Sequence, residues 1–159
     1  MTTAAESGRT SWLTLLPFLA ATMTVAVIGA LSATGVPQDY RSLEQPGFAP
    51  PSWVVGPVWT VLCVMIGVSG WLLWRPRGWT PVVTLWAVQL VLNLAWTPLF
   101  FGAGQRGLAL VDIVLLDLLV AATVVLSWRT SRPAALLLVP YLAWTCFATA
   151  LNASIWAMN

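Results

Sequence analysis

The 159-residue chain is 59% hydrophobic and only 8% charged. Soluble domains carry about 25% charged residues because their surfaces face water, so the composition excludes an ordinary soluble domain. Five membrane-spanning helices of about 20 residues each would occupy most of the chain. The net charge of +2 supplies no basic surface for nucleic acid. The absence of histidine and lysine removes the imidazole base, the usual haem or zinc ligand and the Schiff-base amine.

The first predicted helix covers residues 12–34. Its apolar run is longer than the roughly 7–15 residues of a signal-peptide core, which favours a membrane span. Residues 35–52 then form a polar, proline-rich connector that contains Tyr40 and Phe48. Connectors of more than about 12–15 residues are often functional lids, and the prolines favour an ordered lid.

Four further apolar runs predict helices over residues 53–74, 79–101, 106–128 and 133–156, separated by short polar connectors. Because a membrane span must satisfy its own backbone hydrogen bonds, the spans are expected to be helices rather than open strands. The predicted fold is all-α: a single domain, 1–159, built as a five-helix membrane bundle with one long lid loop, 35–52, between the first two helices.

Arginine placement predicts the orientation of this bundle. Short cytoplasmic loops collect positive charge, and five arginines fall on the side of the N-terminus against two on the opposite side. The five are Arg9, Arg75, Arg77, Arg129 and Arg132, and the two are Arg41 and Arg106. The N-terminus is therefore expected in the cytoplasm, with the lid and the C-terminus facing outward.

Few reactive side chains lie inside the predicted spans. Cys63 and Cys146 are interpreted as small buried hydrophobic residues rather than as a disulfide or metal pair. Asp112 and Asp117 are the acids within an apolar helix. A separation of five residues places them about 140° apart around that helix, so they cannot face one site. Asp112 suits a helix-packing hydrogen bond. Asp117, nearer the midplane, is either a buried pair partner or protonated, and a functional role for it stays open.

The remaining polar and aromatic residues leave two readings open. Trp86, Gln89, Asn93 and Trp96 or Thr97 share one helical stripe, which either binds neighbouring helices or faces a ligand. Tryptophans near helix ends fit an aromatic belt at the membrane surface; they are Trp12, Trp53, Trp74, Trp79, Trp128 and Trp156. Deeper indoles suit either packing or stacking on a planar ligand; they are Trp59, Trp71, Trp86, Trp96 and Trp144.

Several long segments resemble one known family. They are 40–60 (YRSLEQPGFAPPSWVVGPVWT), 89–102 (QLVLNLAWTPLFFG), 109–112 (ALVD), 140–144 (PYLAW) and 147–152 (FATALN). In order and content they are similar to the motifs of the tryptophan-rich sensory protein/translocator protein family, also called the peripheral benzodiazepine receptor family. The similarity extends from about Tyr40 to Asn152.

The resemblance implies a multi-pass protein, most simply of a bacterial cell membrane, that forms a homodimer and binds porphyrins or related tetrapyrroles under the first loop. No cofactor or metal is required. By motif position, the ligand-binding residues would be Tyr40, Trp53, Trp59, Asn93, Trp96, Trp144 and Ala148. The equivalents of Trp59 and Trp144 are implicated in light-dependent porphyrin breakdown in bacterial relatives, which makes these two the candidate catalytic residues.

Three positions depart from the family pattern. Phe48 stands where tryptophan is usual, and Cys63 stands where tyrosine is frequent. The final segment, 151–159, lacks the tyrosine and arginine of the proposed sterol motif, which is a weak pattern even when intact. The resemblance therefore does not extend to sterol recognition through this segment.

Three functions remain open at this point. The first is a tetrapyrrole-binding sensor, regulator or carrier with an apolar pocket. The second is an enzyme for porphyrin photo-oxidation. The sequence supplies no conventional catalytic group, so such chemistry would depend on Trp59, Trp144 and the ligand's own photochemistry. The third is a transporter of porphyrins or sterol-like lipids, against which the absence of an internal inverted repeat argues. The binding protein is the expectation.

Overall fold

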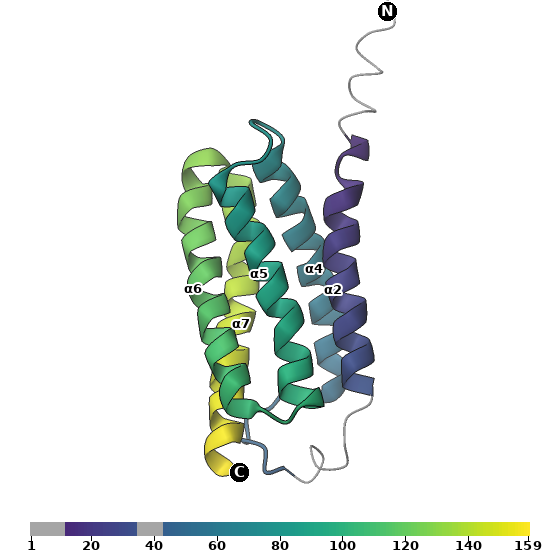
Figure 1. Ribbon diagram of the computed structural model, residues 1–159, viewed down its shortest axis with the longest axis vertical. Helices are drawn as coiled ribbons and strands as arrows, with labels where there is room; N and C mark the ends of the chain where they lie inside the picture. The colour runs from purple at the N-terminus through teal and green to yellow at the C-terminus, as the bar shows by residue number, and fades with distance from the viewer. Residues whose placement is uncertain (1–11, 35–42) are drawn as a thin grey trace, which may run out of the picture.

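The structure is a computed structural model that describes residues 12–34 and 43–159, and the described residues form helices and connectors with no strand (Figure 1). The helices are α2 (Leu16–Thr34), α4 (Ser52–Trp74), α5 (Pro81–Thr97), the π-helix η1 (Pro98–Gly102), α6 (Arg106–Thr130) and α7 (Arg132–Met158). Because η1 continues α5, the described chain crosses the length of the bundle five times.

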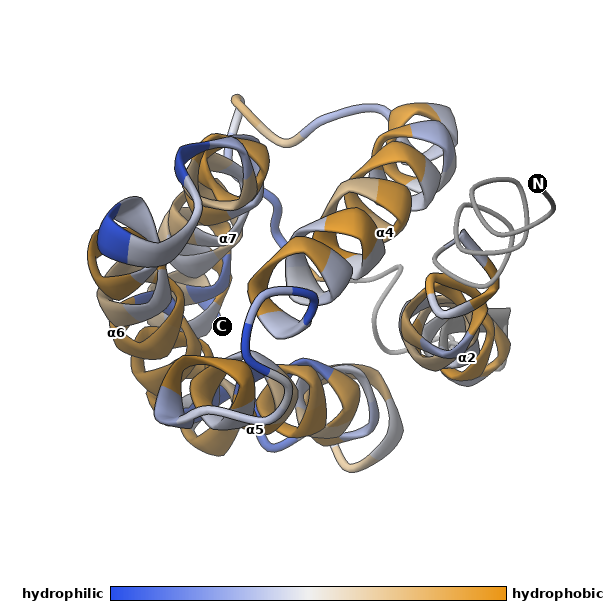
Figure 2. Ribbon diagram, turned by 90° about the horizontal axis from the view of Figure 1, so that it is seen from above, coloured by the Kyte–Doolittle hydropathy of each residue, from blue (hydrophilic) through white to orange (hydrophobic). Residues whose placement is uncertain are grey.

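The five rods form a closed ring in the order α2, α4, α7, α6, α5, and each rod packs against its two neighbours in that ring. Viewed from above, the ring surrounds a common interior (Figure 2). Successive rods run in opposite directions (Figure 1). The start of α2 and the connectors 75–80 and 131 therefore lie at one end, while the segment 43–51 and the connector 103–105 lie at the other end.

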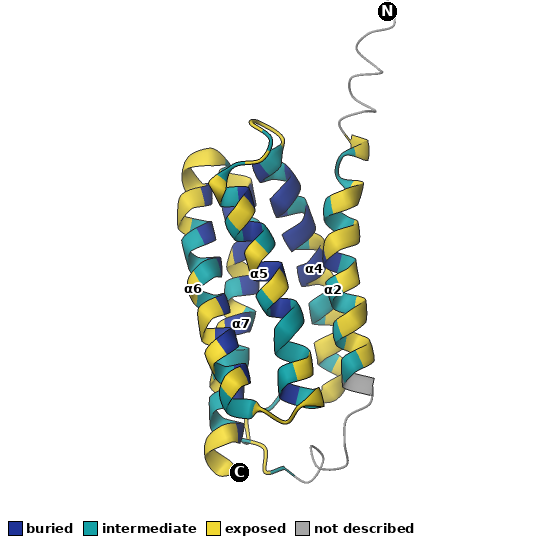
Figure 3. Ribbon diagram, in the orientation of Figure 1, coloured by how far each residue is buried: buried dark blue, intermediate teal, exposed yellow. Residues whose placement is uncertain are grey.

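The outer surface of the ring is apolar. Four rods, α4, α5 with η1, α6 and α7, are long and apolar enough to cross a membrane, and α2 adds a shorter apolar stretch, Leu16–Ser32. Large hydrophobic side chains such as Val61, Leu118 and Val125 are exposed on this surface (Figure 3). Lipid tails are the solvent that such a surface requires. The predicted five-helix membrane bundle is confirmed.

Several helix ends differ from the prediction. The first predicted helix is interrupted: residues 12–13 are helical, residues 14–15 form a turn, and α2 begins at Leu16 with Pro17 in its first turn. The third begins at Pro81 rather than at residue 79, because Thr80 is extended and proline suits the first helical position. Only Ser131 separates α6 from α7, and its side chain caps α7 by accepting a hydrogen bond from the Ala134 amide at 3.4 Å.

The third helix extends to Gly102, close to the predicted end at residue 101, but its last turn is not α-helical. Pro98 has no amide hydrogen to continue the α-helical pattern, and the chain widens into the π-helix η1, in which the Ala103 amide donates to the Pro98 carbonyl at 2.8 Å. π-Helical turns are rare and occur frequently at functional sites. This one carries Phe100 and Phe101, whose place in the interior is described below.

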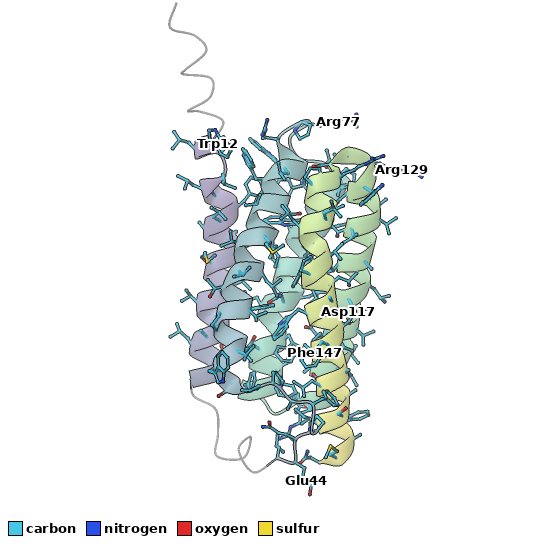
Figure 4. All side chains as sticks on the ribbon, turned by 180° about the vertical axis from the view of Figure 1, so that it is seen from behind. Trp12, Glu44, Arg77, Asp117, Arg129 and Phe147 are labelled. Carbon is cyan, nitrogen blue, oxygen red and sulfur yellow. The ribbon has the colours of Figure 1, made fainter. Side chains whose placement is uncertain are left out.

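Five of the seven arginines used to predict the orientation lie among the described residues. Arg75, Arg77, Arg129 and Arg132 lie at the end where α2 begins, opposite Arg106, and Figure 4 shows Arg77 and Arg129 at the same end as Trp12 and far from Glu44. Arg9 and Arg41 lie outside the described residues. The relative placement of the connectors therefore agrees with the sequence, and the cytoplasmic position of the N-terminus stays a prediction.

Candidate functional site

A cavity of about 590 Å³ lies inside the ring, in the half of the bundle that carries the lid. Every rod contributes to its wall, and Pro50 of the lid segment also lines it. Its volume falls within the roughly 300–1,000 Å³ of small-molecule sites. Phe48 of the lid packs edge-on against Phe147 of the cavity wall, with ring centroids 6.1 Å apart, so the segment 43–51 lies across this end of the bundle.

One face of α4 supplies a wall of the cavity. Ser52, Val55, Gly56, Trp59 and Thr60 line it, and their spacing of three and four residues is that of a single helical face. Trp53 follows Ser52 by one residue and is turned about 100° away. Its indole is 75% exposed and lies outside the cavity lining. The structure therefore does not bring Trp53 together with the other predicted ligand-binding residues.

Three of the five deep tryptophans line the cavity: Trp59 from α4, Trp96 from α5 and Trp144 from α7. Trp96 stacks on Phe100 with ring centroids 5.0 Å apart, and Trp144 lies 5.8 Å from the ring of Phe147. Large flat aromatic faces therefore reach the cavity from three different rods. Such faces suit a planar aromatic ligand.

The other two deep tryptophans serve helix packing. The indole N–H of Trp86 donates to the Ile66 carbonyl of α4 at 2.9 Å, and its ring lies against Gly70. A Cβ atom added at Gly70 would lie 2.3 Å from that ring. Trp71 donates to the Thr14 hydroxyl at 2.9 Å. Neither residue lines the cavity, so the structure separates the packing indoles from those that face the interior.

Polar side chains hold the cavity wall in place. The Asn93 amide donates to the Tyr141 hydroxyl at 2.7 Å, which joins α5 to α7. The Trp96 indole donates to Asn152 at 3.2 Å, and the Asn152 amide donates to the Arg106 carbonyl at 3.1 Å. Asn93, Trp96 and Asn152 all line the cavity. These bonds connect the aromatic wall to the first residue of α6.

The polar stripe of the third helix divides in the same way. Trp86 packs on α4, whereas Asn93, Trp96 and Thr97 reach the cavity. Gln89 lies between these two groups and is 0% exposed, and neither its amide nitrogen nor its amide oxygen has a hydrogen-bond partner among the described residues. One part of the stripe therefore packs against a neighbouring helix and another part faces the cavity, at different depths of one helix.

The two aspartates lie outside the cavity lining. Asp117 accepts a hydrogen bond from the Thr149 hydroxyl at 2.7 Å, which links α6 to α7 near the middle of the bundle (Figure 4). Asp112 is buried, and its Oδ2 atom has no partner among the described residues. Cys63 is buried as predicted, but the prediction of burial was wrong for Cys146, which is exposed on α7.

The remaining predicted residues fall as follows. Ala148 lines the cavity beside Trp144, one helical turn along α7. Tyr40 lies outside the described residues. Among the described residues, no three His, Cys, Asp or Glu side chains come together as a metal site would require. The structure thus brings together Trp59, Asn93, Trp96, Trp144 and Ala148, and their role in binding stays a prediction.

Sequence reasoning missed two parts of the cavity wall. The first is the face of α2 formed by Ala26, Gly29 and Ala30. These small residues are spaced three and four positions apart, a pattern from which this face could have been predicted. The second is the aromatic group Phe100, Phe101 and Phe147. Phe100 and Phe101 reach the wall through η1, which the sequence did not predict.

The fold and the cavity define a class: a multi-pass helical membrane protein that encloses a small-molecule-sized, aromatic-lined cavity beneath a lid. Residues 14–157 match the family model described as TspO/MBR family. The chain belongs to this family of membrane sensor and translocator proteins, which confirms the resemblance found in the sequence.

Named relatives extend across domains of life. The chain is similar to the Translocator protein of Homo sapiens, with 44% identity over 76% of this chain and 74% of the relative. It is similar to the Tryptophan-rich protein TspO of Archaeoglobus fulgidus, with 38% identity over 91% of this chain and 98% of the relative. It is also similar to the Tryptophan-rich sensory protein of Cereibacter sphaeroides, with 34% identity over 93% of this chain and 92% of the relative.

Proposed function

We propose that this protein binds a porphyrin or a similar planar tetrapyrrole in the cavity beneath the lid, as a membrane sensor or carrier. The observation that carries the proposal is the convergence of Trp59, Trp96 and Trp144 from three rods on one cavity of about 590 Å³. Burial of a flat conjugated ring between indoles gains both hydrophobic and stacking free energy. The ligand needs no metal ligand or countercharge from the protein to gain this free energy.

Fluorescence titration tests the proposal. Purified protein in nanodiscs is titrated with protoporphyrin IX in dim light, and tryptophan quenching gives the Kd. Stacking contributes about 0.5–1.5 kcal/mol for each aromatic pair, so the double variant Trp59→Phe, Trp144→Phe should raise the Kd about tenfold. The matched control is Trp128→Phe, Trp156→Phe, which changes two exposed indoles outside the cavity lining. Equal, non-saturating quenching in all three proteins would refute porphyrin binding.

A second candidate function is light-dependent breakdown of the bound porphyrin. It is favoured by one observation: Trp59 and Trp144, the two candidate catalytic residues, line the same cavity. In this reaction the excited porphyrin would activate dissolved oxygen, both oxygen atoms would add across a carbon–carbon double bond of the ring, and cleavage of that bond would leave two carbonyl groups, with Trp59 and Trp144 holding the ring in place. Illumination of the complex should bleach the porphyrin only with both tryptophans present, whereas persistence of the porphyrin spectrum in wild-type protein would leave binding as the function.

The homodimer implied by the resemblance is part of the proposal. The exposed apolar faces of the rods provide surface for contact with a second copy or with lipid. Cross-linking in nanodiscs that contain one chain or two chains distinguishes contact with a second copy from contact with lipid. Porphyrin affinity that is equal in both preparations would show that the cavity of one chain is sufficient for binding.

A further inference from the structure

A groove of about 700 Å³ lies on the outside of the bundle, where the start of α6 meets the end of the chain after α7. It is separate from the cavity inside the ring, with which it shares no lining residue. The first residues of α6 line one side, and Trp156 and Asn159 line the other. Arg106 is the one charged side chain that the described residues contribute to this lining, so they give the groove a positive charge.

The Arg106 side chain has a donor that the described residues do not satisfy. Its Nε atom is buried, and no hydrogen-bond partner for it lies among them. The backbone beneath this side chain is held in place, because the Asn152 side chain donates to the Arg106 carbonyl at 3.1 Å. Buried polar atoms are nearly always paired, and an unpaired one calls for a bound ion, ligand or water. An acceptor from outside the chain is therefore expected beside Arg106.

Other donors reach the same groove. Gly107 and Leu108 lie in the first turn of α6, where backbone N–H groups have no acceptor within the helix, and the Gln105 side chain does not cap them. A Cβ atom added to Gly107 would lie 3.5 Å from Nε1 of Trp156, so the indole nitrogen lies against this turn. A helix N-terminus, an arginine and an indole N–H together favour a phosphate group as the acceptor.

The groove lies at the depth of lipid headgroups. α6 has 25 residues and is about 37 Å long, which exceeds the roughly 30 Å hydrocarbon core of a bilayer. Its first turn therefore lies near the membrane surface. From there a stripe of exposed apolar side chains continues along α6; its members are Leu108, Val111, Leu115 and Leu118. The stripe is about 15 Å long, which equals half the hydrocarbon core, the depth of one layer of acyl chains.

We propose that this groove binds one anionic phospholipid of the leaflet on the lid side, with its phosphate at Arg106 and an acyl chain along the stripe on α6. Anionic headgroups are attracted to basic side chains near the membrane surface. Phosphatidylcholine also carries a phosphate, but its ammonium group cancels that charge. The lipid site does not depend on the proposed function, because it shares no lining residue with the cavity.

Native mass spectrometry of the full chain in an uncharged detergent tests the lipid site. Dioleoylphosphatidylglycerol and dioleoylphosphatidylcholine are titrated separately, and the fraction of protein with one bound lipid gives each Kd. One arginine near an anionic lipid changes the affinity about fivefold. Wild-type protein should therefore bind phosphatidylglycerol about fivefold more tightly than phosphatidylcholine, and Arg106→Gln should remove most of this preference.

The matched control is Arg129→Gln, which changes an exposed arginine at the other end of the same helix and should keep the preference. Overturning results would be no preference in wild-type protein, a preference that Arg106→Gln leaves unchanged, or an equal loss in both variants. Melting temperatures of the two variants establish that both are folded.

Two further measurements separate a lipid from a free anion. Inorganic phosphate in excess should not displace phosphatidylglycerol, because it has no acyl chain to lie along the stripe. Displacement would overturn the lipid assignment in favour of a free-phosphate site. Leu115→Ala removes part of the stripe and should weaken both lipids by a similar factor, with the ratio of their Kd values unchanged. Wild-type affinity for both lipids in this variant would contradict the placement of the acyl chain.

Discussion

The two halves of the bundle use the same residue type in opposite ways. In the half near the start of α2, which we call the packed end, Trp71 and Trp86 are buried with their indole N–H groups donating to Thr14 and to a backbone carbonyl. In the half under the lid, which we call the cavity end, Trp59, Trp96 and Trp144 line an open volume.

Small residues make this difference. At the packed end, Gly70 removes the side chain that would collide with Trp86, so the ring lies directly on the α4 backbone. At the cavity end, Gly29 lines the cavity, and a Cβ atom added there would meet only the Thr97 hydroxyl at an ordinary 3.5 Å. Gly70 therefore allows two helices to pack closely, whereas Gly29 leaves space in the cavity.

The largest expected effect comes from Gly70→Ala. The new Cβ would lie 2.3–2.8 Å from three atoms of the Trp86 ring, and overpacking of this kind costs about 1–3 kcal/mol. The melting temperature in detergent should fall clearly. The matched control, Gly29→Ala, should leave it unchanged or slightly raised because alanine is the better helix former. Equal melting temperatures for both variants would contradict the idea that Gly70 is needed for a tight helix contact and Gly29 is not.

A crossed pair of tryptophan variants follows in size. Trp86→Phe removes the hydrogen bond to Ile66 and part of a buried ring, and an interhelical hydrogen bond in a membrane bundle contributes roughly 0.6–2 kcal/mol. Trp144→Phe removes area from the cavity wall instead. Trp86→Phe should lower the melting temperature more, and Trp144→Phe should raise the Kd for protoporphyrin IX more. Thermal melts and titrations on the same preparations measure both quantities. If both variants lowered the melting temperature alone, or raised the Kd alone, the two ends of the bundle would not differ in the way proposed.

Gln89→Met should act in the opposite direction. The Gln89 amide is fully buried with neither polar atom partnered by a described residue, and an unsatisfied buried polar group costs about 1–3 kcal/mol. Methionine has nearly the same shape without that cost. The melting temperature should rise by an amount that corresponds to about 1 kcal/mol. A fall would mean that the amide is satisfied in the membrane, by bound water or by a ligand.

The sequence predicts whole helices of this architecture better than it predicts helix ends or single turns. Apolar runs long enough for a bilayer predicted the rods, because lipid leaves the backbone no other way to pair its polar groups. Helix ends were predicted less closely, since a turn at residues 14–15 precedes α2 and α5 begins only at Pro81, two residues after its predicted start. Pro98 marked a place where the α-helical hydrogen bonding changes, but proline alone does not indicate whether a helix ends, kinks or widens, so the π-helix was missed.

The site was predictable only in part for a related reason. Spacing along α5 could place Trp86 and Trp96 on one stripe but could not show which one meets a glycine on another helix. The family motifs pointed to Trp59, Asn93 and Trp144, which the structure brings to one cavity. Trp53 belongs to the same motif region but is exposed outside the cavity lining, which a motif cannot reveal.

The smallest expected effect concerns the attachment of the lid. The Asn159 side chain accepts a hydrogen bond from the Glu44 amide and donates one to the Glu44 carbonyl, both at 3.1 Å. It also donates to the Ile155 carbonyl at 2.9 Å. These bonds hold the lid segment against the end of α7, on the side of the bundle where the cavity lies. The two bonds to Glu44 are solvent-exposed, so each contributes at most about 0.5–1.5 kcal/mol.

Asn159→Ala should therefore leave the melting temperature within about 1 °C, because the bonds lie outside the packed core. It should accelerate porphyrin release about twofold to fivefold in stopped-flow fluorescence, since the lid then separates from α7 more often. Asn159→Asp keeps the acceptor but loses the donor, so it should give an intermediate release rate. Met158→Ala, a change at the neighbouring exposed residue, is the control. Unchanged release in Asn159→Ala would show that the lid attachment and the cavity are energetically independent, whereas faster release without loss of stability would extend the contrast between the two ends from structure to dynamics.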